Sequence, residues 1–283
     1  MAGTLYVVST PIGNLEDITH RAVRVLKEVK MIACEDTRHT AKLLQHFGIE
    51  TKTVSYHEHN EQQRATELLN FLRAGQDVAI VSDAGTPGIS DPGFRVIRLA
   101  LENRLRVVPV PGATALIAAL VASGLPSDRF FFAGFLPARS GQRRTRLIEL
   151  SSIPSTLIFY EAPHRIANSL KDAREILGDR DAAVARELTK VHEEIQRGRL
   201  SDLEARFRQT TAEARGEMVL LIDRQVIQTA AASEELQIST LVAALEAEGM
   251  EPRSALKRVA KDLGMSRDEA YRRLTAERSK EKH

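Results

Sequence analysis

Short apolar runs alternate with longer amphipathic stretches through the first half of the chain. The runs are rich in Val, Ile and Leu and predict five strands: Leu5–Ser9, Met31–Glu35, Thr53–His57, Asp77–Asp83 and Leu105–Pro111. Apolar residues recur every three or four positions from Ile18 to Val29, and similar helical spacing covers Thr37–Phe47 and Gln62–Leu72. Because parallel strands need crossover helices, we expect an α/β domain with a largely parallel sheet and helices on both faces.

A second α/β unit begins after Gly124-Leu125-Pro126. Helical spacing runs from His164 to Leu177, among apolar runs that predict four strands: Arg129–Phe135, Ser155–Glu161, Ala182–Thr189 and Gly216–Asp223. The segment after Asp223 holds no strand-like run, which predicts helices only. We therefore expect three parts, an N-terminal α/β domain over residues 1–122, a C-terminal α/β domain over 123–228 and a helical extension over 229–283.

The extension ends in a pattern typical of a helix-turn-helix unit. In SALKRVAKDLGMSRDEAYRRL one helix ends at Gly264, and Ser266 precedes the next helix with Glu269 three residues later, as in a capping box. The second helix carries Arg272 and Arg273, which suit contact with a nucleic acid. The alternative is a helical hairpin that caps the fold and exposes a solvated basic face.

Composition is that of an ordinary folded protein. Hydrophobic residues make up 43% of the 283 residues and charged residues 28%, which excludes a largely disordered or fibrous chain. Cys34 is the only cysteine, so an intramolecular disulfide and a Cys-rich metal site are excluded and a reducing compartment is indicated. The longest apolar stretch, near Ala115–Ala122, is too short to span a bilayer, and no signal-peptide pattern opens the chain. We expect a cytoplasmic protein that does not enter a membrane.

The net charge of +2 is an average over very uneven segments. Residues 229–251 hold five acids and no Lys or Arg, whereas 252–283 hold ten bases and five acids. A second basic cluster, PARSGQRRTR, reads as a loop with no acid, and we expect its arginines to contact phosphate: Arg139, Arg143, Arg144 and Arg146. A solvated surface loop is the alternative. Together the two clusters favour a nucleic-acid partner, against the near-neutral total.

The strongest chemical signal is the segment VSDAGTPGISDPG, residues 81–93, directly after a predicted strand. Gly lets a ligand approach the backbone, Pro stiffens the loop, and ligands bind at the carboxyl ends of strands in open α/β sheets. VPVPGATALIAAL, with Thr114, is a second strand end of this kind, although a plain helix cap is the alternative there. No G-x-G-x-x-G or P-loop pattern is present, so a dinucleotide or nucleoside triphosphate site is not indicated.

Polar residues also follow other predicted strands, in CEDTRHT, SYHEHNE, FYEAPHR and ARELTKVHEE. Clusters at strand ends of both α/β units predict one cleft between them. The His57-x-His59 pair has no obvious third metal ligand, so we expect a site without a metal.

The motifs TPIGNLEDIT, CEDTR, VSDAGTPGISDPG, VPGATA, FYEAPHR, RELTK and GEMVLLI occur in the order found in one bacterial family. Over residues 4–223 the chain resembles the small-subunit ribosomal RNA methyltransferase I family, which is similar to the tetrapyrrole methylases in fold. The resemblance implies transfer of a methyl group from S-adenosylmethionine to the 2′-hydroxyl of a cytidine in 16S ribosomal RNA, at the decoding centre. It also implies a homodimer.

The resemblance further implies that S-adenosylmethionine lies folded in the cleft between the two α/β domains. Carried over position by position, it implies cofactor contacts at Pro11, Asp83, Ala84, Gly85, Thr86, Ile89, Thr114, Ala115, Tyr160, Glu161, Ala185 and Glu217. A methyltransferase for a small molecule such as a tetrapyrrole, which shares this fold, and a non-catalytic RNA-binding protein are the alternatives.

Methyl transfer to a ribose hydroxyl mainly requires that oxygen, methyl carbon and sulfur be held in line, which can supply roughly 7 to 11 kcal/mol of the barrier. A general base would add about 10² to 10⁴ in rate. The candidates for this base are Asp36, His57, Glu58, His59 and Glu187. Arg38, Arg165 and Lys190 are candidates to bind RNA phosphate or assist the hydroxyl. The sequence selects no single base among them, and each is equally suited to a structural hydrogen bond at a strand end.

Overall fold

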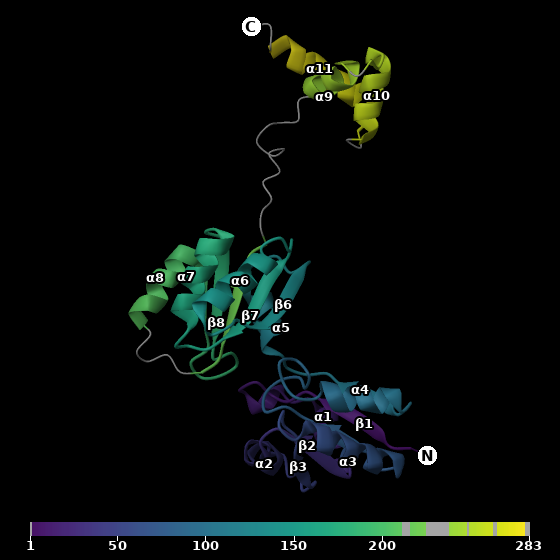
Figure 1. Ribbon diagram of the computed structural model, residues 1–283, viewed down its shortest axis with the longest axis vertical. Coiled ribbons are helices and arrows are strands. Elements are labelled where there is room, and N and C mark those ends of the chain that lie inside the picture. Colours follow the sequence, from purple (N-terminus) through teal and green to yellow (C-terminus); the bar gives the residue numbers. More distant parts are fainter. Residues whose placement is uncertain (1, 211–215, 225–237, 248, 263–264, 281–283) are drawn as a thin grey trace. The chain divides into compact units, whose positions relative to one another are not determined.

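The computed structural model describes residues 2–210, 216–224, 238–247, 249–262 and 265–280 (Figure 1). The chain divides into two compact units, residues 1–225 and 226–283, and each is described by itself. Among the described helices, none is both long and apolar enough to cross a membrane.

The first unit opens with a parallel five-stranded sheet in the order β3-β2-β4-β1-β5. Its strands are β1 (Thr4–Val8), β2 (Met31–Cys34), β3 (Thr53–Ser55), β4 (Val78–Ile80) and β5 (Arg106–Val110). The helical segments between them are a 3₁₀ turn (Leu15–Asp17), α1 (His20–Glu28), α2 (Thr37–His46), α3 (Glu61–Arg73) and α4 (Phe94–Glu102). The predicted parallel α/β sheet is confirmed.

Helices cover both faces of this sheet because successive strand residues point to opposite sides. Met31 and Ala33 pack into a core with α3 and α4, whereas Ile32 and Cys34 pack into a second core with α1 and α2. β2 and β4 are buried along their whole length, which accounts for their continuous apolar runs.

The second sheet is mixed, in the order β6-β7-β10-β8-β9. Its strands are β6 (Phe130–Phe135), β7 (Thr156–Glu161), β8 (Asp181–Arg186), β9 (Glu194–Arg199) and β10 (Met218–Ile222). Only β6 and β7 are parallel, and the other pairs are antiparallel. The sequence does not predict β9, since EIQRGR is a polar edge strand that lacks an apolar run.

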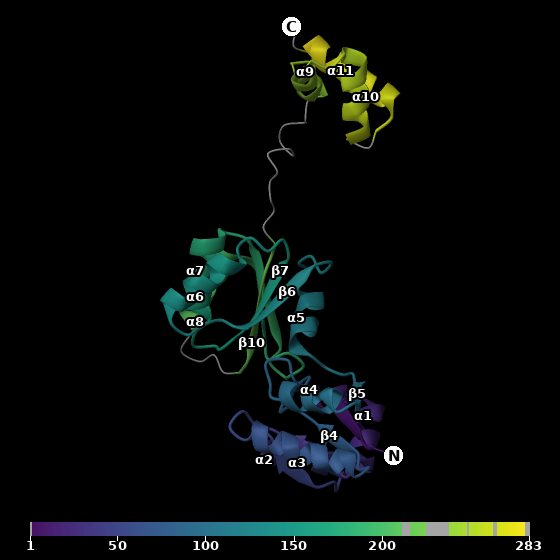
Figure 2. The same ribbon diagram turned by 45° about the vertical axis from the view of Figure 1, so that its right-hand side comes forward.

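Four helices cover this second sheet: α5 (Ala115–Ser123), α6 (Ser140–Leu150), α7 (Ile166–Leu177) and α8 (Leu200–Thr210). Helices α6, α7 and α8 share one core on one face, and α5 packs on the other, as Figure 2 shows. Leu116 and Leu120 of α5 contact residues of β7, β8 and β10, so this helix packs on the second sheet although most of it lies before the predicted boundary at residue 122. The division at residues 122 and 228 stays a prediction.

The predicted basic loop at residues 137–146 is wrong, because α6 begins at Ser140. Arg143, Leu147 and Leu150 recur at helical spacing and are all buried. The Arg143 guanidinium lies 2.6 Å from the Asp172 carboxylate of α7, so it is paired in the interior and does not present a charge to RNA. The sequence pattern does not reveal this helix, because one of its core-facing positions is an arginine, and arginine is normally taken as a surface residue.

The other arginines of this cluster differ in their surroundings. Arg144 pairs with Asp172 and Glu175, and Arg146 pairs with Glu149 at 2.8 Å. Arg139, which precedes the helix, is exposed. Of the four, it is the one best placed for an external phosphate.

The second unit is a three-helix cluster of α9 (Ile238–Ala247), α10 (Pro252–Asp262) and α11 (Arg267–Lys280). Apolar residues of all three helices form one core. The predicted cap is confirmed, because Ser266 Oγ accepts a hydrogen bond from the Glu269 backbone N–H at 3.2 Å. The predicted helix end at Gly264 lies outside the described residues, and α10 is described to Asp262.

Candidate active site

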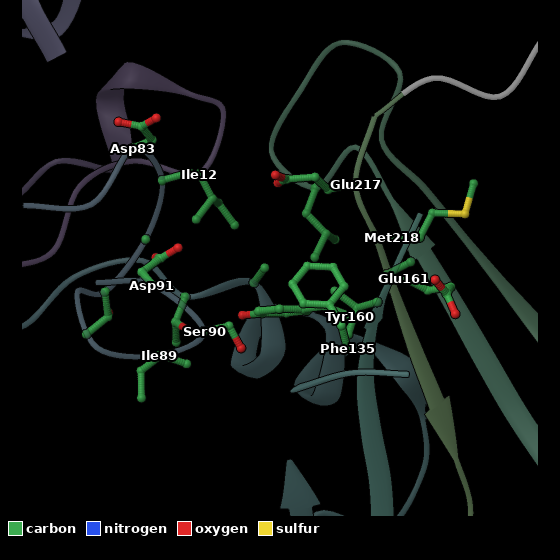
Figure 3. Close-up of a pocket in the computed structure, with 18 of the residues that line it drawn as sticks. Ile12, Asp83, Ile89, Ser90, Asp91, Phe135, Tyr160, Glu161, Glu217 and Met218 are labelled. Atoms are coloured by element: carbon green, nitrogen blue, oxygen red, sulfur yellow. The ribbon is translucent and has the colours of Figure 1, made fainter. Parts of the chain in front are cut away.

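A cavity of about 290 Å³ lies where loops of the first sheet face strands of the second. Figure 3 shows Ser90 and Asp91 on one side, and Phe135, Tyr160 and Glu217 on the other. Eleven of the twelve residues implied as cofactor contacts line it: Asp83, Ala84, Gly85, Thr86, Ile89, Thr114, Ala115, Tyr160, Glu161, Ala185 and Glu217. Pro11 does not line the cavity, but its neighbour Ile12 does. The sequence motifs therefore meet in one place, and their role as cofactor contacts stays a proposal.

Backbone hydrogen bonds hold the loop after β4 in place. Thr10 and Gly85 exchange two of them, with N···O distances of 2.8 and 3.2 Å. Gly85 has φ +84°, and a Cβ there would lie 3.4 Å from Ile12 Cγ2. The position thus favours glycine for its conformation and for the space left beside the cavity.

Side-chain hydroxyls join this loop to its neighbours. Thr86 Oγ1 lies 2.9 Å from Ser9 Oγ after β1, and it donates to the Ala113 carbonyl after β5 at 3.3 Å. The loops at three strand ends therefore form one connected wall, which suits a ligand bound mainly by backbone groups.

The opposite wall is built by the second sheet. The Tyr160 ring lies against Phe135 and Phe132, with centroid distances of 5.6 and 4.8 Å, and burial raises the pKa of Tyr160. Glu161 is buried and binds Ser169 Oγ at 2.5 Å and the Arg165 guanidinium at 2.9 Å. Arg165 does not line the cavity, and its ion pair with Glu161 indicates a structural role rather than contact with RNA phosphate.

Carboxylates dominate the charge of the lining: Glu35, Asp83, Asp91, Glu161, Glu187 and Glu217. Lys190 is the one lysine or arginine among the lining residues, and its Nζ is 2.9 Å from Glu187 Oε1. Burial, followed by the charge of Glu35, raises the pKa of Asp91 to about 6. Burial and the charge of Asp83 raise the pKa of Glu35. Such a cavity stabilises a positively charged ligand.

Glu187 and Lys190 are the only two of the eight candidate catalytic residues that line the cavity. Asp36 caps α2 and pairs with Arg38 at 2.9 Å, and these hydrogen bonds lower the pKa of Asp36 to about 2. A carboxylate this acidic is a poor base.

His57, Glu58 and His59 lie outside the lining as well. His57 Nε2 lies 3.1 Å from the Asn60 side-chain amide, and its ring packs edge-on against His59. Among the described residues, no group of three or more His, Cys, Asp or Glu is arranged to hold a metal ion.

Glu35 and Asp91 line the cavity although sequence patterns alone do not single them out as candidates. Both belong to conspicuous motifs, CEDTR and VSDAGTPGISDPG, and their place in these motifs is the sequence feature that could have identified them as site residues. Phe135, Leu188 and Met218 also line it, and only the packing of the second sheet places them there.

A family model described as Tetrapyrrole (Corrin/Porphyrin) Methylases matches residues 4–204. Ribosomal RNA small subunit methyltransferase I of Pseudomonas aeruginosa is 55% identical over 222 residues, which cover 78% of this chain and 79% of the relative. Its counterpart in Micromonospora olivasterospora is 47% identical over 281 residues, covering 98% and 89%. The chain belongs to the ribosomal RNA small subunit methyltransferase I family of tetrapyrrole methylases. The resemblance in the motifs is confirmed.

Solved structures of other tetrapyrrole methylases share the fold. A cobalt precorrin-4 methyltransferase is 18% identical with a TM-score of 0.58, covering 77% of this chain and 94% of that one. Uroporphyrin-III C-methyltransferase of Thermus thermophilus, crystallised with S-adenosylhomocysteine, is 22% identical with a TM-score of 0.54, covering 77% and 97%. The cofactor of this methylase family is S-adenosylmethionine, as expected from the motifs.

The residues of the cavity fit this cofactor. Its sulfonium and amino groups are positive, and the lining supplies an excess of carboxylates with the single lysine already paired. The connected loop wall at Gly85 and Thr86 offers backbone groups without bulky side chains, and Phe135 and Tyr160 offer aromatic surface for a base.

Proposed function

We propose that this methyltransferase transfers the methyl group of S-adenosylmethionine to the 2′-hydroxyl of a cytidine in 16S ribosomal RNA. The single observation that carries the proposal is the acidic cavity, in which the family's motifs from both α/β domains meet. The names of the relatives support ribosomal RNA of the small subunit as the substrate. The proposal includes a cytoplasmic location, where this RNA is assembled into the small subunit. It also includes a homodimeric state.

When bound, S-adenosylmethionine supplies a methyl group on a positively charged sulfur. The loop wall from Asp83 to Thr86 would hold the cofactor, and Tyr160 would close the opposite side of the cavity. Holding the ribose oxygen in line with the methyl carbon accounts for roughly 7 to 11 kcal/mol of the barrier. Positioning by rigid loops is thus the main contribution of the protein.

The hydroxyl proton must leave as the oxygen–carbon bond forms. Among the bases predicted from sequence, only Glu187 lines the cavity, and its carboxylate is paired with Lys190. We propose that Glu187 accepts this proton or orients the hydroxyl, with Lys190 near the RNA phosphate. The excess of carboxylates keeps the polyanionic RNA backbone at the rim, so only the target ribose approaches the cofactor.

The test is incubation of the protein with S-adenosylmethionine labelled in the methyl group and small subunits that lack the modification. Label on the ribose of one cytidine is the expected result, and parallel incubation with free 16S ribosomal RNA identifies the preferred form. Label on a base, or no label on RNA, contradicts the proposal. Methylation of a tetrapyrrole instead of RNA supports the small-molecule alternative.

A Gly85→Val variant tests the role of the loop wall in cofactor binding. The added side chain meets Ile12 and imposes a strained φ, so we expect at least tenfold weaker cofactor binding by calorimetry. Gly48→Val is the matched control, because Gly48 has φ +57° with nothing within 4 Å of an added Cβ. Equal cofactor affinity in both variants contradicts the role given to Gly85.

A further inference from the structure

Helix α10 presents a row of cations on its solvent face. Arg253, Lys257 and Lys261 are all exposed, while Ala255, Leu256, Val259 and Ala260 of the same helix are buried. Residues four apart on a helix lie on one face, about 6 Å apart along the axis, so the three side chains form a row about 12 Å long. We call these three residues the α10 row.

Within the described part of the chain, the α10 row lacks the ion pairs that engage two neighbouring arginines of this unit. Arg258 pairs with Asp262 at 3.2 Å, and Arg273 pairs with Glu269 at 2.9 Å. In the described part of the chain, no carboxylate lies within ion-pair distance of Arg253, Lys257 or Lys261, nor does one for Arg267 or Arg272 of α11. The charge of the row is therefore open to an external anion.

Helix α9 shows that this positive charge is not spread evenly over the unit. Helix α9 contains no Lys or Arg, and its only charged residue is Glu246. Since all three helices pack around one core, the positive surface of the unit belongs to α10 and α11. An uneven distribution of this kind suits a polyanion that binds one side.

An exposed aromatic ring accompanies the cations on α11. Tyr271 is 62% exposed, lies four residues after Arg267 and directly precedes Arg272, both also exposed. Arg267 and Tyr271 are neighbours on the helix surface. An exposed aromatic ring near guanidinium groups suits an unpaired base flanked by phosphates, and an acidic peptide would not require it.

We propose that the α10 row binds the phosphate backbone of the substrate RNA and that Tyr271 stacks on an unpaired base of the same RNA. This inference rests on the proposed function, because it takes RNA as the substrate. It adds α10 to the contact expected from sequence at Arg272, and it leaves out Arg273, which is already engaged by Glu269.

The experiment compares two double variants of the full-length protein. Lys257→Gln with Lys261→Gln removes two charges of the α10 row. Arg258→Gln with Arg273→Gln removes two paired charges of the same unit, one from α10 and one from α11. Binding of a labelled 16S ribosomal RNA transcript is measured by fluorescence anisotropy at several KCl concentrations. Circular dichroism and calorimetry with S-adenosylmethionine establish that both variants fold and bind cofactor.

We expect the Lys257/Lys261 variant to bind the transcript about tenfold more weakly and its salt slope to fall by about 1.4, as for two lost phosphate contacts on a single strand. The Arg258/Arg273 control should change affinity less than threefold. Tyr271→Ala should weaken binding about tenfold with an unchanged salt slope, while Tyr271→Phe retains affinity.

An equal loss of RNA affinity in the two double variants overturns the proposal. Displacement of the transcript by polyglutamate at equal charge concentration also overturns it, because it would indicate an acidic protein partner. The wild-type methylation assay separates this inference from the proposed function. If wild-type protein labels ribose and the Lys257/Lys261 variant binds RNA normally, only the α10 row is wrong. If wild-type protein fails to label RNA, the proposed function itself fails.

Discussion

The Glu187 carboxylate packs directly against the backbone of Gly216, where β8 and β10 meet. A Cβ on Gly216 would lie 1.7 Å from Glu187 Oε1 and 3.0 Å from its Cγ. Gly216 has φ +94°, and Glu187 itself has φ +50°. A glycine is therefore required beside the one sequence-predicted base that lines the cavity.

Replacement of Gly216 by Ala should displace the Glu187 side chain and slow methyl transfer at least tenfold, measured in single-turnover assays with saturating cofactor. The unfavourable φ adds a stability cost of about 1 to 2 kcal/mol. Gly124→Ala is the control, since Gly124 has φ +79° with nothing within 4 Å of an added Cβ. Equal loss of activity in both variants would mean that backbone strain, and not the contact with Glu187, is responsible.

Asp91 should make the stability of the protein depend on pH. Its pKa is raised to about 6 from an ordinary value of 3.8, so between these values the folded state binds more protons than the unfolded state. The free energy of unfolding should therefore fall as pH rises through this window. The full loss of stability from the buried, charged Asp91 should be reached above about pH 6.

An Asp91→Asn variant should be more stable than wild type at pH 7.5 by about 1 to 2 kcal/mol, and this difference should shrink towards pH 4. Urea denaturation at both pH values measures it. Asp17→Asn, at an exposed position, serves as the comparison. A difference that is the same at both pH values would contradict the raised pKa.

The buried ion pair of α6 and α7 should govern stability without affecting RNA binding. Arg143→Ala leaves the buried Asp172 carboxylate without its main partner and should cost about 3 to 5 kcal/mol in urea denaturation. Arg146→Ala, at a more exposed pair with Glu149, should cost less than about 1 kcal/mol. Loss of RNA affinity in folded Arg143→Ala protein would restore the surface role that the sequence suggests.

Removal of residues 230–283 should separate RNA docking from cofactor binding. The cavity belongs entirely to the first unit, so calorimetry with S-adenosylmethionine should give an unchanged affinity. Affinity for the 16S transcript should fall, together with its salt dependence. Unchanged RNA affinity of the shortened chain would show that the helical unit has another role.

Local patterns were sufficient to locate several strands of the first sheet. β1, β2 and β5 lie within one residue of the predicted bounds at each end, because continuous Val and Ile runs have few other stable arrangements. β9 escaped prediction for the opposite reason, since an edge strand with one partner tolerates Glu, Gln and Arg.

The sequence by itself determined the alternating α/β order, the rigid loop from Asp83 to Thr86, the capped helix at Ser266 and the family of the chain. Each of these depends on neighbouring residues or on a continuous motif. Tertiary structure decided which polar groups face the cavity, because strands far apart in sequence meet there. It brought Glu35 and Asp91 to the lining, left Asp36 and His57 outside it and buried Arg143 against Asp172. A charged residue type shows what a side chain can do, but only its packing partners decide whether that charge is used for structure or for a ligand.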